Sequence, residues 1–238
     1  MHVVKPVRKL GAFLSVVLLP LFVMGCASTE KQVDRGAGAF EQQNYSVARD
    51  QWQAAAESGD ADAQYGLGTL YAGGLGVTKN YTAAIDWYQR AAAQNHAAAQ
   101  FKLGLHHYYG VGVPRNYAQA AEYFRQSAVL GYPAAQNSLG RMYKAGVGVS
   151  SNQRMAAGLL QQAAERGYPP AQNSLGLMYF RGEGVPKNLE ESLFWLELAM
   201  RYGVPGAEHN RDFVASFLDR GKIELTQSRI DNWRPVRQ

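Results

Sequence analysis

A glutamine recurs at a constant interval of 36 residues through the middle of this chain. The four copies are Gln64, Gln100, Gln136 and Gln172, and each follows an alanine. A Leu-Gly pair follows each glutamine at the same distance, and a Gly-x-Gly-Val segment comes after it, first at residues 74–77. No insertion interrupts the register from residue 61 to residue 204. Constant spacing over four copies predicts stacked copies of one unit, and therefore a solenoid.

Each unit is predicted to consist of two antiparallel helices. In the second unit, Ala99, Leu103 and His107 recur at helical spacing. The Gly-x-Gly-Val-Pro segment 110–114 ends this first helix, because its glycines adopt backbone angles that other residues resist and its proline cannot continue a helix. Asn116 is placed to cap the second helix, and Asn80, Asn152 and Asn188 occupy the same position in the other units. The predicted fold is therefore all-α, an α/α-hairpin superhelix.

Across the units the repeat can be written A-x-A-Q-x-x-L-G-x-x-Y-x-x-G-x-G-V-x-x-N-x-x-x-A-x-x-W-Y-x-x-A-A. This pattern resembles the Sel-one-like repeat, a relative of the tetratricopeptide repeat with a longer loop between its helices. The resemblance implies a TPR-like solenoid of Sel-one-like repeats. A solenoid of this kind usually binds a partner along an extended surface and usually lacks a catalytic pocket.

The rest of the chain is divided around these repeats. Residues 1–25 are predicted to be a lipoprotein signal peptide, 26–35 a flexible tether, 36–60 a degenerate N-terminal repeat, 61–204 the four repeats and 205–238 C-terminal capping helices. The last helix is expected over 224–233, with Thr226 as its cap. Trp233 is expected to cover the exposed end, since a solenoid needs a terminal cap.

The first residues have the composition of a targeting segment. Lys5, Arg8 and Lys9 precede an apolar run over 10–24 that Pro20 interrupts. This run is too short to cross a bilayer comfortably, which takes about 20 apolar residues. It fits the hydrophobic part of a secretory signal.

The chain's single cysteine, Cys26, directly follows that run. Its context resembles the lipobox of bacterial lipoproteins, in which the cysteine becomes the lipidated N-terminus. That resemblance implies three acyl chains and a permanent membrane anchor, whereas a single chain binds only reversibly. Ala27, which follows, is typical of outer-membrane sorting, so the expected location is the cell envelope, at the outer membrane facing the periplasm. The alternative is a signal peptide cleaved elsewhere, with Cys26 an incidental free thiol.

The charge balance argues against a nucleic-acid partner. The chain has 24 Lys plus Arg against 19 Asp plus Glu. Removal of the signal segment takes away three cations, which leaves 21 basic against 19 acidic residues. So small an excess does not predict nucleic-acid binding. The sequence does not indicate an oligomeric state.

No motif in the sequence predicts catalysis, a cofactor or a metal site. The Gly-x-Gly-Val segments lie between helices and lack the strand and the Lys-Ser/Thr ending of a phosphate-binding loop. His106 and His107 form the only histidine pair, and His107 occupies a position held by tyrosine in the other units, so it is predicted to pack. No Cys/His cluster with metal-ligand spacing is present. The chain is therefore predicted not to be an enzyme.

One face of the first helices varies between units and is the predicted partner-binding surface. Its candidates are Tyr65, Phe101, Leu105, Tyr108, Asn137, Arg141, Lys144, Asn173 and Phe180. In one interpretation the aromatic members only fill gaps between repeats. In the other they line a groove for an extended peptide or a segment of another envelope protein, with Arg141 and Lys144 receiving acidic groups.

The predicted function is a non-enzymatic protein-interaction scaffold or adaptor that a lipid anchors to the cell envelope. The alternative is a component of cell-wall or exopolysaccharide assembly that binds glycan or envelope enzymes. Exposed aromatic side chains suit either, since they can stack on sugars as well as on peptide side chains.

Overall fold

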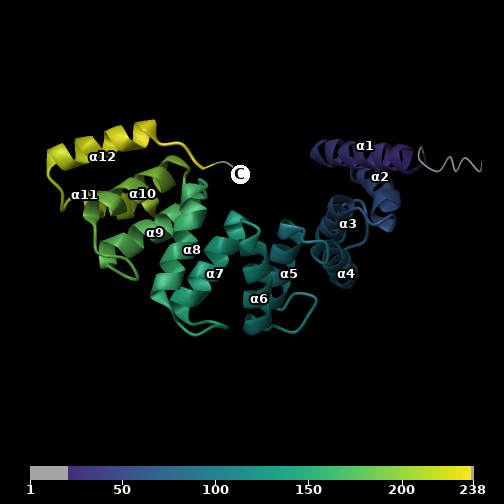
Figure 1. Ribbon diagram of the computed structural model, residues 1–238, viewed down its shortest axis with the longest axis horizontal. Helices are drawn as coiled ribbons and strands as arrows, with labels where there is room; N and C mark the ends of the chain where they lie inside the picture. Colours follow the sequence, from purple (N-terminus) through teal and green to yellow (C-terminus); the bar gives the residue numbers. More distant parts are fainter. Residues whose placement is uncertain (1–20, 237–238) are drawn as a thin grey trace, which may run out of the picture.

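The computed structural model describes residues 21–236, with side chains from residue 29 onward, and these residues form helices and no strand. The helices are α1 (Leu21–Glu41), α2 (Tyr45–Glu57), α3 (Ala61–Gly73), α4 (Tyr81–Ala92), α5 (Ala97–Tyr109), α6 (Tyr117–Val129), α7 (Pro133–Ala145), α8 (Gln153–Glu165), α9 (Pro169–Arg181), α10 (Leu189–Arg201), α11 (Ala207–Ala215) and α12 (Arg220–Asn232). They follow one another in chain order along an arch (Figure 1). The predicted all-α hairpin solenoid is confirmed.

The ends of the helices follow from the repeated glycines and asparagines. The first helix of each repeat ends at a glycine in the left-handed region, with φ of 71° at Gly110. The second helix begins at an asparagine whose side chain accepts a backbone N–H bond, as Asn116 does from Gln119 at 3.0 Å. These caps occupy donors that would otherwise lack partners. The predicted caps at Asn80, Asn116, Asn152 and Asn188 are confirmed.

The second glycine of each interhelix loop is required by the stacking of repeats. Gly184 has a φ of 71°, and a Cβ atom there would lie 2.1 Å from the backbone oxygen of Gln153. The loop of each repeat thus rests directly on the start of the second helix of the repeat before it. A side chain at this position is excluded both by backbone angle and by space.

The repeated glutamine joins neighbouring units. Its side-chain amide donates to a carbonyl in the last turn of the preceding second helix, where carbonyls lack helical partners. The bonds run from Gln64 to Ala56 (3.1 Å), Gln100 to Ala92 (3.3 Å), Gln136 to Ala128 (3.2 Å) and Gln172 to Ala164 (3.2 Å). One buried side chain per repeat therefore fixes the register between units.

Small residues on the first helices face large ones on the second helices. A Cβ atom at Gly104 would lie 2.5 Å from the ring of Phe124, and one at Gly68 would lie 2.6 Å from that of Tyr88. Phe124 and Tyr88 are each 1% exposed. Close packing of this kind leaves no room for an added methyl group.

The N-terminal end differs from the expectation of a flexible tether. Residues 26–35 belong to α1, which pairs with α2 and packs on α3. The indole nitrogen of the buried Trp52 donates to the backbone oxygen of Val33 at 3.2 Å, and Val33 packs against the same cluster. Val33, Ala39 and Phe40 of α1 all pack against this cluster, and this packing with α2 and α3 holds the segment as a helix. The predicted signal peptide falls mostly on residues 1–20, which lie outside the described residues, as does the side chain of Cys26.

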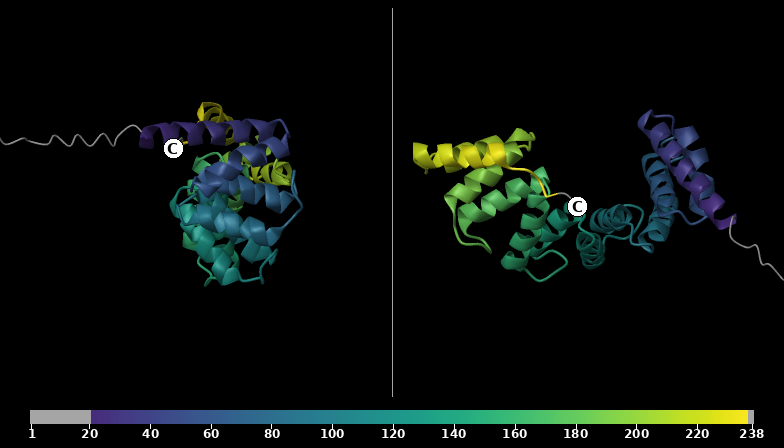
Figure 2. Two further views of the ribbon diagram at one scale, coloured as in Figure 1. Left: turned by 90° about the vertical axis from the view of Figure 1, so that its right-hand side faces the viewer. Right: turned by 45° about the horizontal axis from the view of Figure 1, so that its top comes forward.

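The C-terminal end corrects one predicted cap. Helix α12 begins at Arg220, and Asp219 caps it by accepting from the Lys222 amide at 2.9 Å. Thr226 lies inside the helix, is 2% exposed, and donates to the carbonyl of Lys222. Trp233 packs edge-on against Trp195, with ring centroids 6.4 Å apart. The chain then turns back along the arch toward α8 (Figure 2).

Candidate functional site

Several titratable groups in the described part of the chain are buried between packed helices. Within residues 29–236, no three His, Cys, Asp or Glu side chains are grouped to hold a metal ion. Burial raises the pKa of Tyr88 to about 12, although a hydrogen bond to Thr69 acts in the opposite direction. Burial and the neighbouring His106 lower the pKa of His107, whose ring stacks on Tyr123. These shifts come from packing, as expected for tightly stacked helices.

Three of the predicted partner-binding residues meet around one cavity on the first helices. Leu105 and Tyr108 come from α5 and Arg141 from α7, and together they line a hollow of about 180 Å³. Its other lining residues are Tyr109, Phe124, Ser138, Met142, Ala145 and Val147. We call this hollow the first-helix cavity.

The rim of the first-helix cavity is aromatic and cationic. The ring of Tyr108 meets those of Tyr109 and Tyr117 edge-on, at 5.0 and 5.2 Å between centroids. Tyr109 is 66% exposed. Arg141 is exposed and forms no ion pair with any described residue. A free guanidinium beside exposed rings suits a carboxylate next to an apolar side chain.

Two of the predicted aromatic residues, Tyr65 and Phe101, lie between units. The ring of Tyr65 stacks on His96 at 4.8 Å, and that of Phe101 tilts against Tyr132 at 5.3 Å. In both cases the second residue directly precedes the first helix of the next repeat. Tyr65 and Phe101 are half-buried, so they help to join repeats and present only part of their surface to a ligand.

The remaining predicted residues are largely occupied within the chain. Lys144 Nζ lies 2.8 Å from Glu183 Oε2 in the next repeat. Asn137 is 5% exposed, and its Oδ1 has no hydrogen-bond partner among the described residues. Asn173 Oδ1 accepts from the Asn210 side-chain amide of α11 at 3.2 Å, and Phe180 packs against Phe213 of α11 and Phe217 just beyond it. Arg141 is therefore the basic group of the predicted patch that remains free for a partner.

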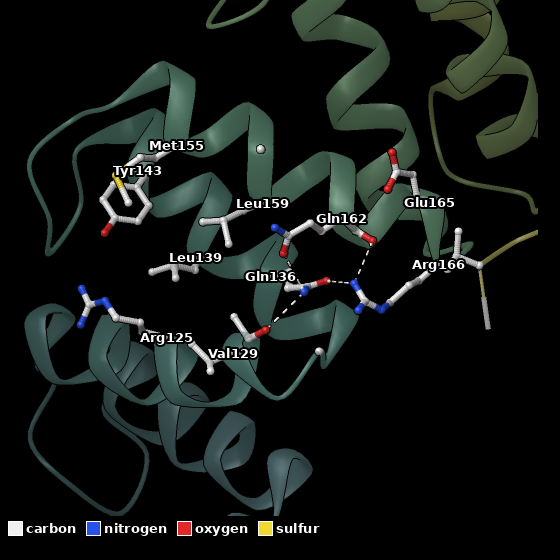
Figure 3. Close-up of a pocket in the computed structure, with 14 residues that line it drawn as sticks. Arg125, Val129, Gln136, Leu139, Tyr143, Met155, Leu159, Gln162, Glu165 and Arg166 are labelled. Carbon is white, nitrogen blue, oxygen red and sulfur yellow. Dashed lines mark hydrogen bonds between the residues drawn. The ribbon is translucent and has the colours of Figure 1, made fainter. Parts of the chain in front are cut away.

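A larger groove on the second helices was not predicted. It has a volume of about 740 Å³ and lies between α6 and α8, with α7 as its floor. Figure 3 shows Val129, Leu139 and Leu159 along it, with the guanidinium groups of Arg125 and Arg166 at opposite sides. We call it the α6–α8 groove.

Hydrogen bonds fix one side of the α6–α8 groove. Gln136 Nε2 donates to Gln162 Oε1 at 3.1 Å, in addition to the carbonyl of Ala128. Arg166 Nη1 lies 3.5 Å from Gln136 Oε1 and 3.4 Å from the carbonyl oxygen of Gln162. One sequence signal marked this groove: Gly158, which stands in the middle of α8 where other repeats have Asp86, Glu122 and Phe194.

No helix within residues 21–236 combines the length and apolar character that crossing a membrane requires. Candidate sites in the described chain are thus surfaces on a helical solenoid. Comparison with known proteins places this solenoid in a family.

The sequence profile of the Sel1 repeat family matches residues 61–96, 97–132, 133–168 and 169–201, which is more than half of the chain. Among solved structures, the c5321 protective antigen of uropathogenic Escherichia coli, which displays an SLR fold, is 30% identical with a TM-score of 0.78. The match covers 88% of this chain and 46% of that one, so this chain spans less than half of the antigen's length.

Two further structures extend the comparison. A Sel1 repeat protein from Oxalobacter formigenes is 28% identical with a TM-score of 0.66, over 82% of this chain and 78% of that one. Immunity protein Pa5087 of Pseudomonas aeruginosa shares the fold at 20% identity and a TM-score of 0.52, over 83% and 82% of the two chains. No curated protein matches this chain.

The boundaries of the matched segments agree with the structure. Each full segment contains one first helix, the Gly-x-Gly-Val loop and one second helix. Sel1 repeat proteins generally act as protein-interaction scaffolds and are typically not enzymes. On the match of profile and fold together, the chain belongs to the Sel1 repeat family.

Proposed function

We propose that this protein is a scaffold of the cell envelope that binds an extended segment of another envelope protein at the first-helix cavity. The observation that carries the proposal is the convergence of Leu105, Tyr108 and Arg141 on one hollow. Its volume of about 180 Å³ suits a single branched or aromatic side chain. Tyr and Arg are the residue types that contribute most at interface centres.

The partner segment is expected to carry an acidic residue beside an apolar one. The apolar side chain enters the cavity between Tyr108 and Met142, and the carboxylate pairs with Arg141. An Arg–carboxylate pair is frequently bidentate, which adds geometric specificity to affinity. Lys144 is excluded from this role because Glu183 already occupies its ammonium group.

Cross-linking in intact cells followed by mass spectrometry tests the partner. Arg141→Glu, which reverses the free charge at the cavity, is expected to abolish capture of the cross-linked partner. Arg90→Glu is the matched control, since Arg90 is also exposed but stands on α4 above the Trp87 ring. Equal capture by both variants would exclude the first-helix cavity.

The membrane attachment proposed here depends on Cys26. The helical path from Cys26 to the packed Val33 spans about 10 Å at 1.5 Å per residue, so an acylated Cys26 would hold α1 and the first repeat close to the bilayer. Cys26→Ser is expected to remove the acyl mass and to release the protein from the membrane fraction. Retention of that variant in the membrane fraction would refute the anchor and leave the cavity proposal unaffected.

A further inference from the structure

The last groove on the second helices is filled by the chain itself. We call α12 together with residues 233–236 the C-terminal segment. Arg229 pairs with Glu191 at 2.8 Å and lies over the Phe194 ring at 4.4 Å. Trp233 packs on Trp195, and Ile230 is 3% exposed. The C-terminal segment therefore lies along α10 and covers its groove-facing side chains.

The same segment also reaches the preceding second helix. The Val236 amide donates to the carbonyl of Glu165 at 2.8 Å, and a Cβ atom at Gly167 would lie 3.1 Å from Pro235. Glu165 and Gly167 lie at and just beyond the end of α8. The segment thus bridges α8 and α10, as Figure 2 also indicates.

The α10 residues that the C-terminal segment covers have equivalents one repeat earlier, on α8. The α8 residues Met155, Gly158, Leu159, Gln162 and Glu165 stand 36 positions before Glu191, Phe194, Trp195, Leu198 and Arg201 of α10. Those five α8 residues all line the α6–α8 groove. The same surface thus occurs twice: on α10 the C-terminal segment covers it, and on α8 it lines the α6–α8 groove, where Val236 is the member of that segment that takes part in the lining.

Gly158 keeps the α6–α8 groove open. A Cβ atom there would meet nothing within 4 Å. Glycine inside a helix costs roughly 0.5–1 kcal/mol relative to alanine, and no packing within this chain requires it. The equivalent Phe194 fills its place in the last repeat. An unfilled position of this kind lets the backbone of another helix approach α8 closely.

The α6–α8 groove also exposes apolar side chains. Val129 is 81% exposed and Met155 46%, and both line it. Leu130, next to Val129, is 40% exposed. Exposed large apolar side chains that gather around one concave surface mark an interaction site. In the last repeat, the C-terminal segment covers the equivalent surface.

Charges of opposite sign stand at two equivalent positions of α8 and α10. Lys222 of α12 pairs with Glu190 at 3.0 Å, and Asp231 pairs with Arg201 at 2.9 Å. One repeat earlier, Arg154 replaces Glu190 and Glu165 replaces Arg201. A second copy's α12 in the α6–α8 groove would therefore face like charges at both ends. The groove selects a helix with the opposite charge pattern.

We propose that the α6–α8 groove binds one amphipathic helix of a partner protein, in the position that α12 takes one repeat later. That helix carries an acidic residue near its start opposite Arg154, apolar residues against Met155 and Leu159, and a basic residue near its end opposite Glu165. It packs its backbone over Gly158. This inference rests on the proposed scaffold function, but neither on the first-helix cavity nor on the lipid anchor.

A peptide made from the chain's own α12 tests the proposal. The probe is residues 220–236 with Lys222→Glu, Arg229→Leu and Asp231→Lys, labelled with a fluorophore and titrated with the full chain while anisotropy is recorded. The control peptide carries Arg229→Leu alone, so the two peptides differ only in the two reversed charges. Reversal of two charge pairs is expected to make the modified peptide bind at least about tenfold more tightly than the control.

A second variant places the binding in the groove. Met155→Glu, which copies Glu191 and places a carboxylate against the leucine of the modified peptide, is expected to weaken binding of that peptide at least about tenfold. Val47→Glu is the matched control, because Val47 is exposed to a similar extent as Met155 and stands on α2 at the other end of the arch (Figure 1). Circular dichroism confirms that both variants remain folded.

Three results would overturn the proposal: no binding of the modified peptide, binding no tighter than that of the control peptide, or equal binding by wild type and Met155→Glu. Each would leave the capture experiment on Arg141 unaffected, so failure here is distinguishable from failure of the scaffold function itself.

Discussion

The two grooves at the C-terminal half of this solenoid share a backbone frame and differ in their side chains. Between α8 and α10, large aromatic residues meet a helix from the same chain. Between α6 and α8, Gly158 and Leu159 take the places of Phe194 and Trp195, and a groove of about 740 Å³ remains. Repeat architecture thus sets where a helix can dock. The side chains of each copy decide whether the chain fills that place itself.

The largest expected difference in the free energy of unfolding comes from shortening the equivalent side chains of the two grooves. Trp195→Ala removes a side chain that is 6% exposed, and it is expected to lower the free energy of unfolding by about 3–5 kcal/mol. Leu159→Ala, in the half-exposed equivalent position, is expected to cost only about 1–2 kcal/mol. Urea denaturation followed by circular dichroism measures both. Equal losses would mean that the open groove is packed as tightly as the filled one.

Two helix glycines are expected to respond to alanine with opposite signs. Gly104→Ala places a methyl group 2.5 Å from the Phe124 ring, so it should destabilise the fold by about 1–3 kcal/mol. The midpoint of urea denaturation measures this change. The slope of the unfolding free energy against urea concentration should stay the same, which shows that the variant unfolds in the same transition. An unchanged midpoint would remove the packing account of the first-helix glycines.

Gly158→Ala is the other member of that pair. Since nothing lies within 4 Å of its added methyl group, it should stabilise α8 by about 0.5–1 kcal/mol. That gain corresponds to a rise in Tm of about 1–4 °C for a chain of this size. Differential scanning calorimetry measures it. A fall in Tm would show that Gly158 has a structural role within the chain.

An effect of similar size is expected at the ion pair that joins the C-terminal segment to α10. Arg229 is about half exposed, so its pair with Glu191 is screened by water. Arg229→Met is expected to cost about 0.5–1 kcal/mol, including the lost contact with the Phe194 ring. Added salt should reduce the difference from wild type. If the loss in the free energy of unfolding does not depend on salt, Arg229 stabilises the fold by apolar packing and not by its charge.

Much of the fold could be predicted from the sequence because the spacing of the repeated residues is enough to locate the helices. The 36-residue register located both helices of each repeat, and the asparagine caps followed from residue type. The partner of the repeated glutamine could not be predicted, since it is a backbone carbonyl of another helix. Thr226 was misplaced as a cap because Asp219, a better one, lies seven residues earlier.

The candidate site was predicted only in part. Variation between repeats identified Leu105, Tyr108 and Arg141, which share a cavity, but not the pairing of Lys144 with Glu183 in the next unit. The α6–α8 groove was not predicted because Gly158 was the one residue in the sequence that indicated it. Its significance depends on where α12 packs, and that is a tertiary fact with no local signal.

Hydrogen exchange of the full chain, with and without a saturating amount of the modified α12 peptide, tests the central claim most directly. If the α6–α8 groove is the open counterpart of the groove that α12 fills, exchange should slow at the end of α6 and along α8, and stay unchanged in α10 and α12. Faster exchange in α12, or slowing confined to α10, would mean that the peptide displaces the chain's own helix, and would contradict the account.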